Sequence, residues 1–123
     1  MISILYVDDE LDLLGLCKIF LELDREFQVT PIASVQEALD CLSRSSFDAI
    51  ISDYQMPGID GLEFLKRVRS RDEDIPFILF TGRGREEVVI EAINNGVDFY
   101  LQKGGDPKSQ FAELGHKIKK AVN

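Results

Sequence analysis

Ile2-Ser3-Ile4-Leu5-Tyr6-Val7-Asp8-Asp9-Glu10 opens the chain with a short apolar run that ends in three consecutive acids. A nearly continuous apolar run is typical of a strand whose two faces are both covered, as in a parallel sheet. From Leu11 to Leu23, apolar residues recur at helical spacing. This part of the sequence therefore predicts a strand followed by a helix, with acids at the carboxyl end of the strand.

The same alternation of apolar runs and helical periodicity continues to the end of the chain. Ser34 to Glu37 forms a capping box that begins the second helix, and Asp106-Pro107 supplies a cap and a first helical residue for the last one. The later predicted strands are Phe27–Ile32, Ala49–Ile51, Phe77–Phe80 and Val97–Leu101, and the later helices cover about residues 35–42, 62–68, 85–95 and 107–122. Five strand–helix units predict an α/β fold with a parallel sheet between two layers of helices.

The second predicted strand contains Pro31, which lacks the N–H that a central strand needs. This strand is therefore expected at an edge of the sheet. An edge position fits the flavodoxin-like, doubly wound (βα)5 arrangement, in which five parallel strands have the order 2-1-3-4-5. In such sheets, ligands bind beyond the carboxyl ends of strands one and three, so the site is expected there.

The composition restricts the partners of this chain. Its 123 residues carry 22 acidic and 14 basic side chains, a net charge of −8, which disfavours direct nucleic-acid binding and favours a divalent cation or a basic protein surface. No apolar run approaches the length of a membrane span. Cys17 and Cys41 lie in helical patterns without metal-ligand spacing, as expected of apolar thiols in a reducing compartment. We therefore expect a soluble, cytoplasmic protein.

Polar residues follow four of the five predicted strands. Asp8 and Asp9 follow the first strand, Asp53 the third, Thr81 the fourth and Lys103 the fifth. Carboxylates gathered in one crevice repel one another and need a cation, and hard oxygen ligands suit Mg²⁺ or Mn²⁺. Each residue alone has an ordinary explanation as a turn, cap or surface charge. Together they predict a site for phosphoryl transfer, with Asp53 as a carboxylate nucleophile between the metal ligands and the Thr/Lys pair.

This set resembles the receiver domain of two-component response regulators over essentially the full chain. The resemblance is carried by the acid pair Asp8-Asp9, by Asp53 followed by Met56-Pro57-Gly58, by Thr81-Gly82 and by Lys103. It implies a single receiver domain over residues 1–123, without an effector domain.

The resemblance also implies a phosphorylation-dependent signalling switch, not an ordinary enzyme. Asp53 would accept a phosphoryl group from a sensor histidine kinase or a phosphotransfer domain, and the domain would assist its own phosphorylation and dephosphorylation. Asp9, Asp53 and the backbone carbonyl of Gln55 would bind Mg²⁺ directly, and Asp8 would act through water. Thr81 would hydrogen-bond the phosphoryl group, and Lys103 would contact it by charge.

Other family positions imply how the switch is read. Tyr100 matches the switch aromatic that turns inward as Thr81 moves, although an edge-strand aromatic packed on the last helix is the alternative reading. Gln55 and Arg83 match variable positions that tune the approach of a hydrolytic water. The face made by the fourth helix, the fifth strand and the fifth helix would meet a downstream protein or output domain, and the resemblance also allows a homodimer on phosphorylation.

One position departs from the family. Gly104 follows Lys103 where proline is usual, and a cis bond without proline would cost about 3 kcal/mol. We therefore expect a trans bond and a looser loop, with consequences for Lys103 placement and phosphoryl lifetime.

Three other functions fit parts of the pattern. An aspartate-based phosphohydrolase would need a second carboxylate two residues after Asp53, where this chain has Gln55. A flavin-binding module would need a glycine- and hydroxyl-rich loop where the first strand ends in acids. A non-phosphorylated pseudo-receiver that only binds partners is disfavoured because Asp53, Thr81 and Lys103 are all present.

Overall fold

The computed structural model describes residues 1–71, 74–82 and 85–122, within which strands and helices alternate along the chain. The strands are β1 (Ile2–Val7), β2 (Phe27–Ile32), β3 (Ala49–Ser52), β4 (Phe77–Thr81) and β5 (Phe99–Gln102). The helices are α1 (Leu11–Leu21), α2 (Val35–Arg44), α3 (Gly61–Ser70), α4 (Glu86–Asn94) and α5 (Pro107–Val122). The predicted succession of five strand–helix units is confirmed.

The strands form one parallel sheet in the order β2-β1-β3-β4-β5. Pro31 lies in β2, opposite Tyr6 of β1, and β2 is an edge strand as its proline predicted. In the β1–β3 pair, Val7 is level with Ser52. Because the strands are parallel, the residues that follow β1 and β3 emerge at the same edge of the sheet.

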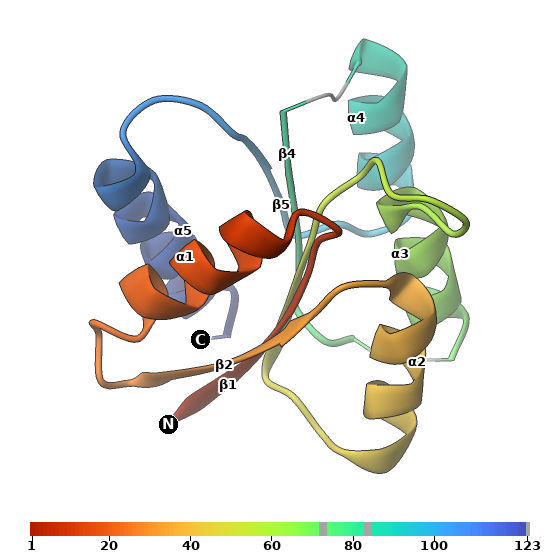
Figure 1. Ribbon diagram of the computed structural model, residues 1–123. Helices are drawn as coiled ribbons and strands as arrows, with labels where there is room; N and C mark the ends of the chain where they lie inside the picture. The colour runs from red at the N-terminus through yellow and green to blue at the C-terminus, as the bar shows by residue number, and fades with distance from the viewer. Residues whose placement is uncertain (72–73, 83–84, 123) are drawn as a thin grey trace.

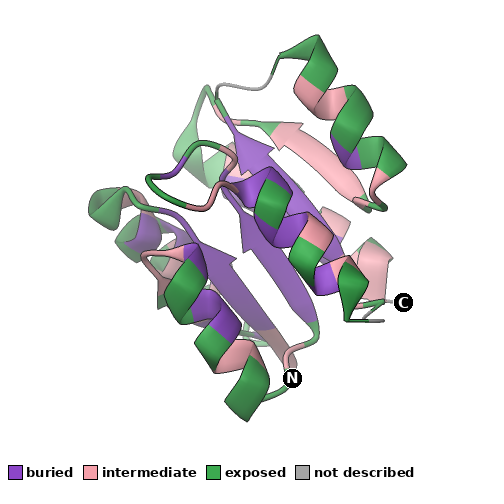
Figure 2. Ribbon diagram, turned by 90° about the vertical axis from the view of Figure 1, so that its right-hand side faces the viewer, coloured by how far each residue is buried: buried purple, intermediate pink, exposed green. Residues whose placement is uncertain are grey.

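Helices cover both faces of the sheet (Figure 1). On one face, α1 and α5 bury side chains such as Cys17 and Phe111 against the strands. On the other face, α2, α3 and α4 contribute Leu39, Phe64 and Ala92. Figure 2 shows the consequence: β3 and β4 are buried along their whole length and β1 over its last four residues, whereas β5 is only half-buried. The doubly wound architecture is therefore confirmed.

Local signals account for three of the predicted helix boundaries. The Ser34 side chain accepts a hydrogen bond from the Glu37 N–H at 3.2 Å, and the Asp106 carboxylate accepts one from the Ser109 N–H at 3.0 Å. Gly96, at φ +87°, ends the turn after α4. These three predicted boundaries are confirmed.

Several element ends differ from the sequence expectation by about two residues. Helix α1 ends at Leu21, not at Leu23, and α2 continues to Arg44. Strand β5 begins at Phe99, because the Val97 N–H still bonds the Ala92 carbonyl of the α4 terminus at 3.1 Å.

Cys17 is buried, whereas Cys41 is only partly buried. Among the described helices, none combines the length and apolar character that crossing a membrane would require.

Candidate functional site

Three carboxylates gather where β1 and β3 end. Asp8 and Asp53 are buried and Asp9 is exposed, and one oxygen from each lies within 4.8 Å of the others. The pairing of β1 with β3 brings them together, and the Asp53 N–H extends that pairing by bonding the Val7 carbonyl at 2.9 Å. The sequence prediction that these acids meet is confirmed.

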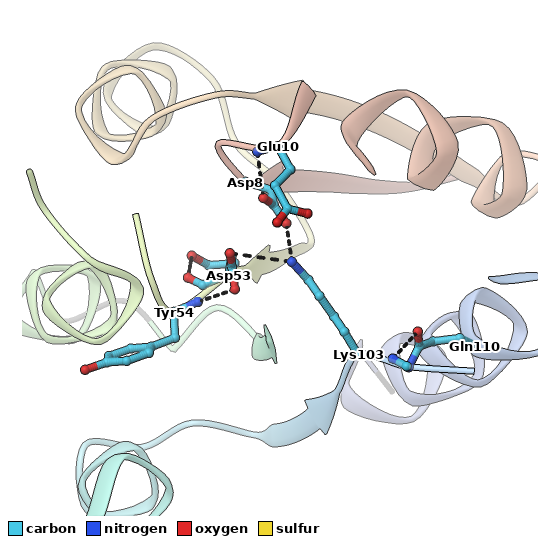
Figure 3. A network of polar contacts seen from close by, with 8 residues as sticks. Asp8, Glu10, Asp53, Tyr54, Lys103 and Gln110 are labelled. Carbon is cyan, nitrogen blue, oxygen red and sulfur yellow. Dashed lines mark hydrogen bonds and ion pairs between the residues drawn. The ribbon is translucent and has the colours of Figure 1, made fainter. Parts of the chain in front are cut away.

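Lys103 reaches the acids from the loop between β5 and α5 (Figure 3). Its Nζ lies 2.7 Å from Oδ2 of Asp8 and 3.5 Å from Oδ2 of Asp53. The ammonium also lies 5.8 Å from the centre of the Phe80 ring. The Lys103 ammonium thus bridges the two buried carboxylates, and its shorter contact is with Asp8.

Asp8 is the most enclosed of the three acids, with a side-chain exposure of 0%. Burial raises the pKa of its carboxyl, while hydrogen bonds from Lys103 and from the Glu10 N–H, at 2.9 Å, act in the opposite direction. The Lys103 ammonium pairs with Asp53 as well as with Asp8, so Asp8 shares this positive charge with a second carboxylate. A second cation would favour the charged form.

The donor set fits a hard divalent cation. Asp8, Asp9 and Asp53 offer carboxylate oxygens within one small volume, so this group of three ligands contains neither sulfur nor imidazole. Mg²⁺ prefers such oxygen ligands together with water. The exposed position of Asp9 leaves the cluster open to solvent on one side, which suits a partly hydrated ion.

Hydrogen bonds hold both the side chain and the backbone of Asp53. The Tyr54 N–H donates to its Oδ1 at 2.8 Å, and the Ser52 hydroxyl donates to the Asp53 carbonyl at 2.8 Å. Asp53 Oδ1 is therefore occupied by this hydrogen bond, while Oδ2 faces Lys103.

Gly61, the first residue of α3, is a contributor that sequence reasoning missed. Its N–H bonds the Tyr54 carbonyl at 2.7 Å, and a Cβ at this position would lie only 2.0 Å from the Asp53 carbonyl oxygen. The Asp60 side chain caps α3 by accepting from the Glu63 N–H at 2.8 Å. A glycine directly after a capping aspartate was the available signal, but it does not reveal what the glycine approaches.

A cavity of about 440 Å³ opens over the acids. The predicted site residues among its walls are Asp9, Asp53, Gln55, Thr81 and Lys103. Thr81 is buried at the end of β4, and its carbonyl accepts a hydrogen bond from the Lys103 N–H at 3.1 Å. Two carboxylates, a hydroxyl-bearing residue and a lysine therefore line one cavity, with Asp8 buried beside Lys103.

Tyr100 lies on the face of the sheet that α2, α3 and α4 cover. It is level with Leu79 of β4 and packs against the same cluster. The alternative that it packs on the last helix is wrong, because the neighbouring Phe99 and Leu101 face α5. Burial and the negative charge of Asp53 raise the pKa of the half-buried Tyr100 phenol.

Two further expectations concern loops. No cis peptide bond occurs among the described residues, so the Lys103–Gly104 bond is trans as expected, with Gly104 at φ +146° and Gly105 at φ +81°. The other loop holds Arg83, which lies outside the described residues. Gln55 is exposed at the cavity wall.

A second groove, of about 510 Å³, runs between α1 and α5. Its floor is apolar, with Phe27 and Phe111, and Asp24 is the one acid among its lining residues. It is slightly larger than the cavity at the strand ends but has no cluster of carboxylates. The cavity over Asp53 is therefore the candidate site.

Comparisons with known proteins agree with this geometry. The family model of the response regulator receiver domain matches residues 4–114. The chain is 36% identical over 108 residues to the response regulator SaeR of Staphylococcus epidermidis, covering 88% of this chain and 46% of that protein. It is 33% identical over 118 residues to SaeR of Staphylococcus aureus, with coverages of 96% and 51%. A solved response regulator receiver domain protein from Clostridium thermocellum matches with a TM-score of 0.89 at 29% identity, covering 100% of this chain and 95% of that one.

Proposed function

The chain belongs to the response regulator receiver domain family, and from this premise we propose that it is a phosphorylation-dependent signalling switch whose phosphoacceptor is Asp53. The observation that carries the assignment to Asp53 is its position in the cavity. It is a buried carboxylate with one oxygen held by the Tyr54 N–H and the other facing Lys103. Thr81 lines the same cavity.

In the proposed reaction, Oδ2 of Asp53 attacks the phosphorus of a phosphohistidine carried by a sensor histidine kinase or a phosphotransfer domain. A new P–O bond forms, the P–N bond breaks, and its electron pair remains on the imidazole nitrogen of the donor. The product on this chain is an acyl phosphate. Such transfers depend on positioning and charge neutralisation more than on covalent machinery.

Asp9, Asp53 and the carbonyl of Gln55 are the proposed direct ligands of Mg²⁺, with Asp8 acting through water. The ion, when bound, would supply charge neutralisation for the incoming phosphoryl oxygens. Lys103 lies 3.5 Å from Asp53 and is positioned to contact one of those oxygens. The Thr81 hydroxyl is the proposed hydrogen-bond donor to another. These residues would also let the domain assist its own phosphorylation and dephosphorylation, with Gln55 and Arg83 tuning the access of water.

The proposed output is a change at the face made by α4, β5 and α5. Tyr100 is the proposed connection between this face and the site. It packs on the α4 side of the sheet, and the negative charge of Asp53 contributes to the raised pKa of its phenol. Helix α4 also exposes Ile90 and Ile93, at 52% and 61%. We propose this face as the contact for a downstream protein or output domain, or for a second copy of the phosphorylated chain.

The chain spans about half the length of the curated relatives it matches. The activity and partners of a whole protein, and the single-domain assignment of residues 1–123, are therefore proposals. A cytoplasmic location stays a prediction from the sequence.

The proposed function is tested by intact-mass measurement after incubation with acetyl phosphate, with and without Mg²⁺. We expect the addition of one phosphoryl group that requires Mg²⁺ and is abolished in Asp53→Asn. Asp40→Asn, which changes an exposed aspartate on α2, is the matched control and should behave as wild type. A wild-type chain that takes no phosphoryl group from acetyl phosphate or from a cognate kinase would overturn the proposal.

A further inference from the structure

The loop that carries Lys103 has a backbone with little intrinsic stiffness. Gly104 and Gly105 follow the lysine, and both have positive φ, +146° and +81°. Glycine has access to many backbone conformations, so such a loop has no local reason to hold one of them. Nevertheless, the Lys103 ammonium lies 2.7 Å from the buried carboxylate of Asp8. Some contact from outside the loop must therefore restrain it.

Gln110 of α5 supplies such a contact on both sides of the lysine. Its Oε1 accepts a hydrogen bond from the Gly104 N–H at 3.0 Å, and its Nε2 donates to the Gln102 carbonyl at 2.7 Å. The two backbone groups flank Lys103, and Figure 3 shows Gln110 beside the backbone of this lysine. The lysine's own N–H is bound by the Thr81 carbonyl at 3.1 Å. Three successive residues are thus tied to rigid elements.

The side chain of Gln110 is itself held on a well-anchored helix. The backbone N–H of Gln110 donates to the Asp106 carbonyl at 3.0 Å in the first turn of α5. The next residue, Phe111, is buried in the core and stacks on Phe20 of α1 with ring centres 5.7 Å apart. Gln110 therefore transmits the position of α5 to the loop.

We infer that Gln110 is a positioning residue that fixes the backbone on both sides of Lys103 and so places its ammonium in the phosphoacceptor cavity. The side-chain amide suits this role because it accepts and donates at the same time. A donor at Gly104 and an acceptor at Gln102 also determine which way the amide points. Glutamate would keep only the accepting contact, and a hydrocarbon side chain would keep neither. This inference rests on the proposed function, in which Lys103 contacts the phosphoryl group.

The test is a double-mutant cycle on Asp53 phosphorylation by acetyl phosphate at saturating Mg²⁺, using Gln110→Ala, Lys103→Ala and the double variant. Loss of two hydrogen bonds that hold the loop should lower the maximal rate about fivefold in Gln110→Ala, with a smaller change in the KM for acetyl phosphate. In the Lys103→Ala background, the same substitution should have no further effect, because Gln110 acts through the lysine. Glu113→Ala, which truncates an exposed side chain one turn along α5, should behave as wild type.

Gln110→Met keeps the length of the side chain without its polar atoms. It should show the same loss of rate that is expected for Gln110→Ala. If the alanine variant does not fold, the methionine variant carries the test. A wild-type rate in both Gln110 variants would overturn the inference. So would an equal loss with and without Lys103, which would indicate a general structural role.

A second readout separates this inference from the proposed function. The side-chain ammonium of Lys103 should give an observable, slowly exchanging NMR signal in the wild type, since it is hydrogen-bonded to a buried carboxylate. In Gln110→Met the signal should broaden or disappear, and in Glu113→Ala it should remain. An unchanged signal in Gln110→Met would overturn the positioning role even if the chain proved unable to accept a phosphoryl group.

Discussion

Replacing Gly61 by alanine adds a single methyl group at the point where α3 meets the phosphoacceptor strand. The added Cβ would lie 2.0 Å from the Asp53 carbonyl oxygen, 2.9 Å from the Asp53 carbonyl carbon and 3.0 Å from the Tyr54 Cα. All three are backbone atoms, so no side-chain rotation relieves the overlap. The beginning of α3 and the turn after β3 must move apart.

The size of the effect follows from the geometry. Reaching even a tight 3.0 Å contact from 2.0 Å requires a shift of about 1 Å, and overpacking of this kind typically costs about 1–3 kcal/mol. The same shift stretches the 2.7 Å bond between the Gly61 N–H and the Tyr54 carbonyl, which adds about 1 kcal/mol. We therefore expect Gly61→Ala to lower the free energy of unfolding by about 3 kcal/mol and the Tm by about 12 °C.

Gly15→Ala is the matched control, because this glycine is exposed on α1 and its added Cβ would meet nothing within 4 Å. There, alanine should raise the stability by about 0.5–1 kcal/mol through its better helix propensity. Thermal and urea unfolding of the two variants beside the wild type measures both effects. The reasoning is refuted if Gly61→Ala is as stable as the wild type. In the folded Gly61→Ala chain, Asp53 phosphorylation should also slow, since its carbonyl is the displaced group.

Burial raises the pKa of Asp8 above its value in the unfolded chain. The Asp8 carboxyl therefore contributes stability that is fully present below the pKa of the unfolded state and is lost as the pH rises through the pKa of the folded state. In EDTA, the Tm of Asp8→Asn relative to wild type should therefore increase from about pH 4 to pH 7. Added Mg²⁺ should raise the Tm of the wild type more than that of the variant. A difference in Tm that does not change with pH would contradict this reasoning. Arg69→Ala should lower the free energy of unfolding by about 1–2 kcal/mol in urea unfolding, because Arg69 donates to the carbonyls of Ile75 and Gly96 and pairs with Asp98 at 3.2 Å. Exposed Arg25 is its control, and equal effects of alanine at the two positions would show that the contacts contribute nothing.

Local sequence patterns were sufficient for the architecture. Nearly continuous apolar runs such as Ile2–Val7 and helical spacing such as Leu14, Cys17 and Leu21 reflect which faces of an element are buried, and burial in this chain largely follows them. Pro31 was sufficient to place β2 at the edge, since a missing N–H is a property of one residue. Parallel strands then bring their carboxyl ends to one side, which is why the acids, Thr81 and Lys103 could be grouped without coordinates.

What the sequence by itself determined was therefore the order of the strands and the grouping of the acids, Thr81 and Lys103 at one edge of the sheet. Only the tertiary structure decided the close approaches: Lys103 nearer to Asp8 than to Asp53, Tyr100 on the α4 face, Gly61 against the Asp53 carbonyl and Gln110 around the lysine. The physical reason is one of range. Periodicity and capping depend on neighbours within a few residues, whereas these contacts depend on how each helix docks on the sheet, and a shift of about 1 Å in docking creates or removes them.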